Sequence, residues 1–172
     1  MEQHIDVVKK EKMVMMMMMK EKNFAIMDIE YIQTSKTHRC IRKMYILGKD
    51  GYTDLELEFY PCKPFKDLEK FHQRSFRFCR NHIHKLEYNP TEKYAPPCNT
   101  VLSKINVFIV YNDIDFILYK GGTIERDLCS ELCVPSYNME CLPEKLEKIQ
   151  SHDPQTEVNS YYKQLVGFDY IL

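Results

Sequence analysis

The sequence has almost equal numbers of basic and acidic residues. Its 172 residues include 24 Lys and Arg and 25 Asp and Glu, so the formal net charge is −1. The overall charge of this protein therefore does not attract nucleic acid, and any affinity for nucleic acid requires a local basic patch. The length allows one domain with a real core, and the apolar share of 44% is ordinary for a soluble globular protein.

A long hydrophobic run is also lacking. The apolar stretch Met13–Met19 has seven residues with lysines on both sides, which is too short to span a membrane. No cleavage site of a secretory signal accompanies it. We therefore expect residues 1–22 to be a low-complexity, disordered or loosely helical extension, and residues 23–172 to form a single domain.

The cysteines lack the regular spacing of a disulfide framework. There are seven of them, an odd number, and we interpret them as reduced thiols of a cytosolic or nuclear protein. Cys79, His82 and His84 lie close together, but the two paired ligand sets of a zinc site are missing. We interpret them as a buried Cys and His on the packing face of a helix.

Three strands are predicted in the first third of the domain. Asn23–Ile32 is mostly apolar, and the strand period of two places Asp28 and Glu30 on one face of it. Arg39–Leu47 and Asp54–Tyr60 are the next two strands, and the Gly-Lys-Asp-Gly segment between them is typical of a hairpin. These strands predict an antiparallel meander.

The rest of the chain alternates helical and strand patterns. Apolar residues recur at threes and fours from Phe65 to Leu86, which predicts an amphipathic helix of about five turns. The elements expected after it are a helix beginning at Asn99 or Thr100, a strand at Phe116–Tyr119, a helix over Ile124–Leu132 capped by Thr123, an extended segment at Val134–Cys141, a short helix at Glu144–Gln150, and a final helix with Asp153 as its cap and Pro154 in its first turn. This order predicts an α/β fold whose mixed sheet combines an antiparallel three-strand meander with parallel strands, with helices on both faces.

One side of the predicted helix over Phe65–Leu86 is basic. It carries Arg74, Arg77, Arg80 and Lys85. Such a row is usually a solvated face, and the alternative is a local stripe that binds phosphates. A chain of neutral net charge needs a patch of this kind in order to bind nucleic acid.

Four acidic residues are placed where they can meet at one edge of the sheet. Asp28 and Glu30 come from the first strand. Glu125 and Glu157 come from the first turns of two later helices, and His152 lies five residues ahead of Glu157. Four carboxylates at one place require cations, and two Mg²⁺ or Mn²⁺ ions about 3.5–4 Å apart serve in-line attack at phosphorus. A neutral histidine beside them can take the proton from the attacking water.

The same residues carry a resemblance to a known family. Asp28–Glu30 matches the Asp-x-Glu pair on the first strand of the DEDDh exonucleases, which are ribonuclease-H-like proofreading and RNA-trimming enzymes. Their second motif, His-Asn-x-x-Phe-Asp-x-x-x-Leu, corresponds to residues 120–128, with Gly121 in place of the Asn and Glu125 in place of the Asp. Their third motif, His-x-x-x-x-Asp, corresponds to His152–Glu157, again with Glu for Asp.

This resemblance covers residues 23–166 and implies a ribonuclease-H-like fold. It implies a metal-dependent 3′–5′ exonuclease, a hydrolase that uses Mg²⁺ or Mn²⁺ and acts on the 3′ ends of RNA or DNA. The general base would be His152. The residues implied as metal ligands are Asp28, Glu30, Glu125 and Glu157.

A second resemblance leaves an alternative open. The Maelstrom domain keeps this fold, lacks the acidic tetrad, binds RNA and carries a Glu-Cys-His-Cys cluster. The residues loosely similar to that cluster are Glu125, Cys129, Cys133, Cys141 and His152. The alternative is a catalytically inactive, ribonuclease-H-like domain that binds nucleic acid. The chain also resembles uncharacterised proteins of insect genomes and of mobile or viral elements, which share its Tyr-Lys-Gly-Gly and Ser-His-Asp-Pro segments but imply no chemistry.

Overall fold

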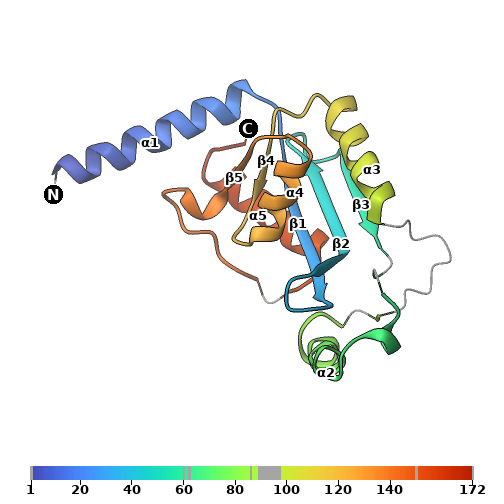
Figure 1. The fold of residues 1–172 in the computed structure, drawn as a ribbon. Helices are drawn as coiled ribbons and strands as arrows, with labels where there is room; N and C mark the ends of the chain where they lie inside the picture. Colours follow the sequence, from blue (N-terminus) through green and yellow to red (C-terminus); the bar gives the residue numbers. More distant parts are fainter. Residues whose placement is uncertain are drawn as a thin grey trace.

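A mixed β-sheet forms the centre of the structure (Figure 1). The computed structural model describes residues 2–59, 61, 63–85, 87–88, 98–149 and 151–171. Within these ranges the sheet has five strands in the order β3-β2-β1-β4-β5. The strands are β1 (Phe24–Gln33), β2 (Arg39–Gly48), β3 (Asp54–Glu58), β4 (Phe116–Tyr119) and β5 (Ser136–Asn138). The α/β class and the mixed character of the sheet are confirmed.

Strands β1, β2 and β3 form the predicted antiparallel meander. β1 pairs with β2 from Ala25 to Gln33, with a register irregularity after Glu30. The turn between β2 and β3 is closed by the Gly51 N–H, which donates to the Gly48 carbonyl at 2.9 Å. Gly51 has φ of +76°, a conformation that glycine adopts without a steric cost, and the predicted hairpin is confirmed.

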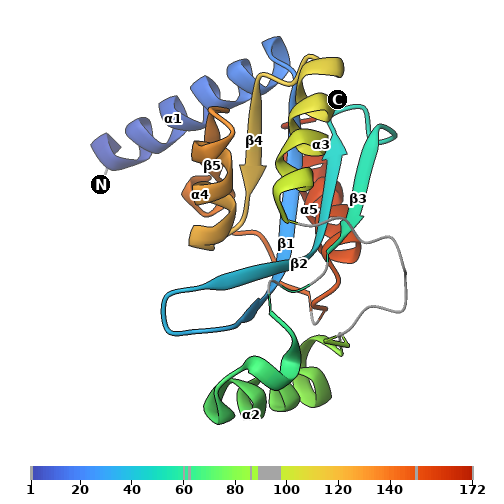
Figure 2. The ribbon, with the colours of Figure 1, turned by 45° about the vertical axis from the view of Figure 1, so that its right-hand side comes forward.

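The parallel pairing of β1 with β4 is short. β4 pairs with β1 only from Phe24 to Ile26, whereas β1 continues to Gln33. Figure 2 shows β1 and β2 extending past the end of β4 toward helix α2 (Lys70–Cys79). Within the described residues, the edge of β1 beyond Ile26 therefore has no strand partner on the β4 side and is open to other groups.

Helices cover both faces of the sheet. The helices concerned are α3 (Cys98–Tyr111), α4 (Thr123–Glu131) and α5 (Pro154–Gly167), and the C-terminal end of α1 (Glu2–Glu21) adds to them. Because side chains alternate along a strand, Met27 and Ile29 of β1 pack with α3 and α4 on one face. Phe24 and Ile26 pack with α5 and the end of α1 on the other face.

The segment expected to be a low-complexity extension forms helix α1. Met19 near its end is fully buried in the core on the α5 side, and neighbouring methionines pack against that core. The Lys49 ammonium donates to the carbonyls of Lys20 and Lys22 at 3.0 Å each and also to that of Met19. It thereby satisfies acceptors that every helix leaves free at its C-terminal end. Among the described residues, no helix combines the length and apolarity that crossing a membrane requires.

The long helix predicted from Phe65 to Leu86 is divided in the structure. Its parts are the 3₁₀ turn η1 (Phe65–Asp67), helix α2 and the π-helical turn η2 (Arg80–His84). Leu68 has extended backbone between η1 and α2, and its side chain is buried with Phe76 against Ile32 of β1. This packing fixes α2 at the far end of β1 (Figure 2). Leu86 lies outside the described residues.

The short helix predicted over Glu144–Gln150 is wrong for the part that the structure describes. Residues 144–149 contain no helical turn. The Glu147 N–H donates to Gln164 Oε1 of α5 at 2.7 Å, and Gln164 Nε2 donates to the Glu147 carbonyl at 3.0 Å. Leu146 is buried in the core. Hydrogen bonds to a distant side chain thus replace those of a local helix, and Gln150 lies outside the described residues.

The two helices that carry later acidic residues begin differently. Asp153 is the N-cap of α5, as predicted, and accepts hydrogen bonds from the Thr156 N–H at 3.1 Å and hydroxyl at 2.8 Å. The predicted cap of α4 is wrong, because Gly122 rather than Thr123 occupies the N-cap position. The Thr123 hydroxyl instead accepts a hydrogen bond from Arg39 of β2 at 2.9 Å.

Candidate functional site: an acidic cluster beside His152

Asp28 and Glu30 lie on the part of β1 that extends past β4. Their side chains continue the row of Phe24 and Ile26 on the α5 side of the sheet. Asp28 is only 8% exposed, whereas Glu30 is half-buried. The strand therefore carries one deeply buried carboxylate and a second one nearer to solvent on the same face.

Glu125 reaches the same edge from the first turn of α4. The residues ahead of it, Gly121 and Gly122, have φ of +68° and +52°, a region that favours glycine. A Cβ atom at Gly122 would lie 2.3 Å from Glu125 Oε2, so a side chain there would force this carboxylate to shift. The Glu125 carboxylate accepts hydrogen bonds from its own N–H and from the Ile29 N–H of β1. It thereby uses the strand edge that β4 leaves unpaired.

Glu157 reaches the cluster from the first turn of α5. It is buried, and its carboxylate shares a hydrogen bond with the carboxyl group of Asp28. Tyr161, one turn later on the same helix face, is also buried in the core. The face of α5 that packs on the sheet therefore presents Glu157 directly to β1.

The carboxylates raise the pKa values of their neighbours. The pKa of Asp28 is raised to about 10, first by burial, then by the hydrogen bond with Glu157 and by the charges of the other three acids. Burial and the charges of the acids on α5 and α4 raise the pKa of Glu30 to about 7. The pKa of Glu125 is also raised to about 7, chiefly by burial, although its hydrogen bonds and the charge of Arg39 oppose the rise. The four acidic residues are thus brought together, and the cluster holds protons at neutral pH.

Two oxygen atoms of this acidic cluster lack a hydrogen-bond partner. They are Asp28 Oδ2 and Glu125 Oε2, both buried within the described part of the chain. A buried carboxylate oxygen without a donor is costly unless a cation or a proton accompanies it. Carboxylate oxygens are also the ligands that Mg²⁺ and Mn²⁺ prefer, so the donor chemistry fits a divalent cation. Across the residues that the structure describes, no three His, Cys, Asp or Glu side chains have the geometry that holds a metal ion.

His152 lies in the exposed loop ahead of α5. It lines a cavity of about 460 Å³ together with Glu30 and Lys148, and the other walls come from the end of β1 and from α2 and η2. The imidazole and the outermost carboxylate of the cluster therefore face one solvent space. A histidine in this position can exchange protons with water beside the carboxylates.

Three groups of the site were not predicted from the sequence. Lys148 and Arg39 place positive charge near the acids and oppose the rise in their pKa values. The Tyr161 phenol is buried, and burial followed by the nearby carboxylates raises its pKa. Lys148 had one local signal, since it lies four residues ahead of His152. Strand pairing brings in Arg39, which has no local signal. Tyr161 lies four residues after Glu157, and the packing of α5 on the sheet buries it.

The cysteines of the Maelstrom-like alternative occupy different environments. Cys129 is buried in the core, and burial raises its pKa to about 12, whereas Cys133 and Cys141 are exposed. A thiol with so high a pKa stays protonated and is a poor metal ligand. On the basic helix, Cys79 is half-buried and His82 is exposed, so the prediction of a buried histidine at that position is wrong.

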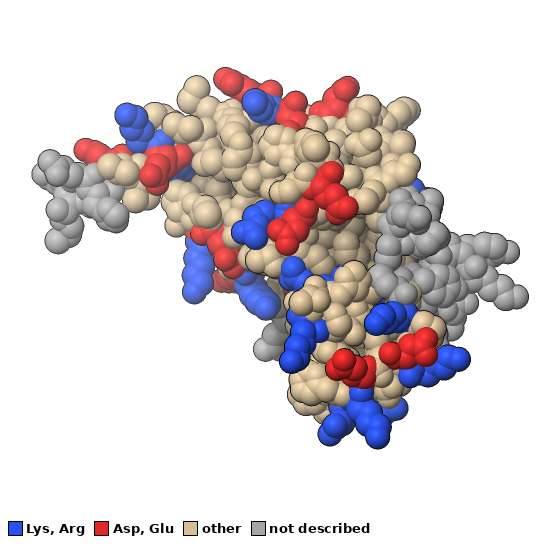
Figure 3. Space-filling view, viewed as in Figure 1, with Lys and Arg blue, Asp and Glu red and all other residues tan. Residues whose placement is uncertain are grey.

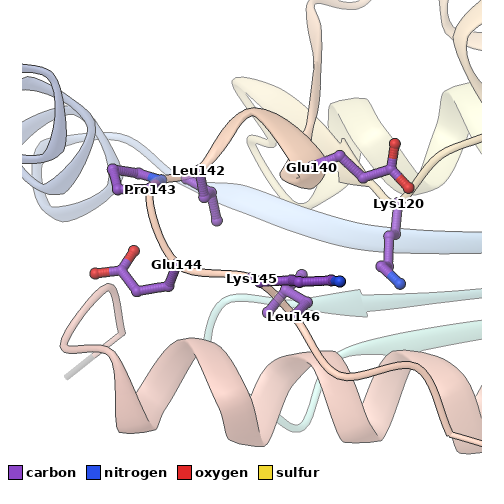
Figure 4. Close-up of a pocket in the computed structure, with 7 residues that line it drawn as sticks. All are labelled: Lys120, Glu140, Leu142, Pro143, Glu144, Lys145 and Leu146. Atoms are coloured by element: carbon purple, nitrogen blue, oxygen red, sulfur yellow. The ribbon is translucent and has the colours of Figure 1, made fainter. Parts of the chain in front are cut away.

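A second cavity, of about 320 Å³, lies beside the irregular segment that precedes α5 (Figure 4). Figure 4 shows Lys120 and Lys145 directed toward the same side, with Glu144 turned elsewhere. Glu144 is held by the Lys12 ammonium of α1 and by the Tyr170 hydroxyl, which donates to it at 2.7 Å. This cavity contains none of the acidic-cluster residues, and its Glu144 joins α1 to the C-terminal end of the fold.

Comparison with protein-family models finds no match, and comparison with curated proteins finds none either. The function is therefore inferred from the geometry of the chain itself.

Proposed function

We propose that this protein is a metal-dependent 3′–5′ exonuclease that removes nucleotides from the ends of RNA or DNA. One observation carries the proposal: four carboxylates from β1, α4 and α5 interact at one place, and two of them have buried oxygens that find no hydrogen-bond partner among the described residues. Clusters of this composition bind pairs of divalent cations for attack at phosphorus. The exposed imidazole of His152, which lines a cavity with one of them, Glu30, adds a proton acceptor.

We also propose that the α/β fold is of the ribonuclease-H-like type. The antiparallel β3-β2-β1 meander, continued by parallel β4 and β5, supports this assignment. The acidic residues lie on the first strand and at the starts of two later helices, in the order that the DEDDh resemblance implies.

The residues have separate roles in this proposal. The carboxylates that would hold Mg²⁺ or Mn²⁺ are those of Asp28, Glu30, Glu125 and Glu157. When bound, such ions lower the pKa of a coordinated water and stabilise negative charge at phosphorus. His152 accepts the proton of the attacking water from the cavity side. The Ile29 N–H holds Glu125 in place by a hydrogen bond.

The hydrogen bond between Asp28 and Glu157 favours a second candidate function. Two carboxyl groups that share a proton can satisfy one another without a cation. The same fold would then be a catalytically inactive domain that binds nucleic acid, as the Maelstrom resemblance implies. The two candidates differ in whether a divalent cation binds and whether strands are cleaved.

The deciding experiment is a nuclease assay on the purified full chain with 5′-labelled single-stranded RNA and DNA. With Mg²⁺ or Mn²⁺ we expect products shortened stepwise from the 3′ end, and no products with EDTA. Asp28→Ala should abolish cleavage, whereas Glu131→Ala, at an exposed acid of α4, should leave it unchanged. Cleavage that persists in Asp28→Ala overturns the proposal, and metal-independent binding without cleavage supports the second candidate.

A further inference from the structure

Helix α2 and the turn after it expose a row of aromatic rings. Phe71 and Phe78 are 69% and 59% exposed, and His82 is exposed as well. The rings of Phe78 and His82 lie 4.7 Å apart between centroids. With 3.6 residues per turn, Phe71 and Phe78 fall on one side of α2, and the ring contact extends the row to His82 in η2. Large apolar rings left in solvent on one face indicate a surface that receives a ligand.

Basic side chains flank this aromatic row. Lys70, Arg74 and Arg77 are exposed and follow one another along the adjoining side of the helix. The segment from residue 63 to residue 88 contains seven Lys and Arg against three Asp and Glu, although the whole chain has a net charge of −1. Figure 3 shows Lys and Arg gathering over α2 at the lower end of the molecule, with fewer acidic side chains among them. Among the three acidic residues of this segment, Glu87 is paired with Arg80 at 3.6 Å.

On its other side, the aromatic row adjoins the cavity that contains Glu30 of the acidic cluster. Ser75 and Cys79, on the neighbouring side of α2, line the cavity that also contains Glu30 and His152. His82, at the end of the row, lines a further cavity, of about 400 Å³, together with His152. Passing around α2, one therefore meets the wall of the cavity, then the rings, then the basic row.

We propose that α2 is a binding platform for single-stranded nucleic acid. Bases stack on Phe71 and Phe78, and the phosphates lie along the basic row formed by Lys70, Arg74 and Arg77. The strand then passes His82, and its end enters the cavity of His152 and Glu30. This inference rests on the proposed function and names its substrate class. A duplex keeps its bases inside the helix, so it cannot use the rings.

The test measures binding without cleavage. Fluorescence anisotropy of a labelled single-stranded oligonucleotide and of the blunt duplex of the same sequence is recorded with the full chain in EDTA. We expect the single strand to bind more tightly. The double variant Phe71→Leu, Phe78→Leu keeps apolar bulk but loses the ring faces, and its affinity should fall by roughly tenfold for each ring. The matching Phe→Tyr double variant should bind as the wild type does.

Two controls separate this surface from the rest of the protein. Tyr52→Leu with Tyr111→Leu removes two rings that are 88% and 84% exposed elsewhere, and it should leave binding unchanged. Replacing Arg74 and Arg77 by Ser should make the fall of log affinity with log salt concentration less steep by about 1.4, since each phosphate contact to a single strand contributes about 0.7 to the steepness. Circular dichroism melts verify that every variant is folded.

Several outcomes would overturn the platform. One is that the Phe→Leu double variant binds the single strand as tightly as the wild type, and another is that the Phe→Tyr double variant loses as much affinity as the Phe→Leu one. A third is equal affinity for the duplex and the single strand. A fourth is that polyglutamate displaces the labelled strand as efficiently as the unlabelled strand does. The last result would indicate an acidic protein partner. Strand binding that needs the rings, with no metal-dependent cleavage in the separate nuclease assay, would remove the exonuclease proposal and leave the platform standing.

Discussion

The carboxyl group of Asp28 on β1 shares a hydrogen bond with the carboxylate of Glu157 on α5. Two buried acids in contact are not both ionised unless a cation accompanies them, so the metal-free pair holds a proton at neutral pH. A divalent cation needs the same oxygens in their ionised form. Protons and metal ions should therefore compete for this pair, and that competition can be measured.

The metal-free protein should lose stability as the pH rises. In the folded protein the pKa is about 10 for Asp28 and about 7 for Glu30 and Glu125, above the ordinary values of 3.8 and 4.5. Between the ordinary and the raised values, the folded protein binds more protons than the unfolded chain, so the free energy of unfolding falls with rising pH. From pH 5 to pH 8 we expect Asp28 alone to cause a loss on the order of 4 kcal/mol, at about 1.4 kcal/mol per pH unit, in urea denaturation with EDTA.

The variant Asp28→Asn tests the origin of this pH dependence. It carries no titrating group at position 28, so its stability should vary less with pH than that of the wild type. Glu131→Gln, at an exposed position of α4, should keep the full dependence. Equal slopes in Asp28→Asn and the wild type would contradict the assignment to the acidic cluster.

Mg²⁺ or Mn²⁺ should raise the melting temperature, and above the dissociation constant the rise should grow with the logarithm of the ion concentration. An ion present at 100 times its dissociation constant stabilises the folded state by about 2.7 kcal/mol. The shift should be larger at pH 8 than at pH 6, because fewer protons then occupy the carboxylates. Glu157→Gln should abolish it. Differential scanning fluorimetry measures the effect, and no shift in the wild type at pH 8 would favour the inactive binding domain.

Replacing His152 by Ala should separate proton transfer from metal binding. Loss of a general base is expected to lower kcat by roughly 10²- to 10⁴-fold. The metal-induced rise in melting temperature should remain, because His152 is not among the proposed ligands. His38→Ala, at an exposed position between β1 and β2, is the matched control for cleavage. If the melting shift disappears together with activity, His152 binds the metal and the role proposed for it is wrong.

Two adjacent glycines provide a matched pair of variants. Gly121→Ala and Gly122→Ala both place a Cβ on a residue with positive φ, and each should cost about 1–3 kcal/mol of stability in urea denaturation. Only Gly122→Ala should also abolish stabilisation by Mn²⁺, because its Cβ would lie 2.3 Å from Glu125 Oε2. At Gly121 the nearest atom is Glu140 Oε1, at 3.3 Å. Equal metal responses of the two variants would argue against Glu125 as a ligand.

The cap of α5 should contribute measurably to stability. Asp153→Ala removes the acceptor for the Thr156 N–H and hydroxyl, and we expect a loss of about 1 kcal/mol in the free energy of unfolding. Asp153→Asn keeps a capping oxygen and should lose much less. Urea denaturation at pH 7 compares the two, and an equally large loss in both would show that charge rather than capping is responsible.

Local sequence patterns predicted most of the fold. The bounds of β4 are those predicted, because a short apolar run bounded by polar residues and glycine is a local signal. Asp153 was correctly predicted as a cap for the same reason. The helix predicted over Glu144–Gln150 is wrong for the described residues, because the backbone of Glu147 forms hydrogen bonds with the side chain of Gln164, which is distant in the sequence. The division of the helix after Phe65 likewise follows from the burial of Leu68 against β1.

The candidate site, like the fold, was predicted in part from local sequence patterns and decided in part by tertiary packing. Alternation along β1 was enough to place Asp28 and Glu30 on one face, since side-chain direction in a strand depends only on position. Packing between distant segments brought Glu125 and Glu157 to these two residues. Because β4 ends early, the Ile29 N–H is free to donate to Glu125. Helix α5 packs on β1 and brings Glu157 to Asp28. Packing also set α2 beside the cavity of His152. Burial and charge interaction depend on which segments touch, so raised pKa values and orphaned oxygens have no counterpart in the linear pattern.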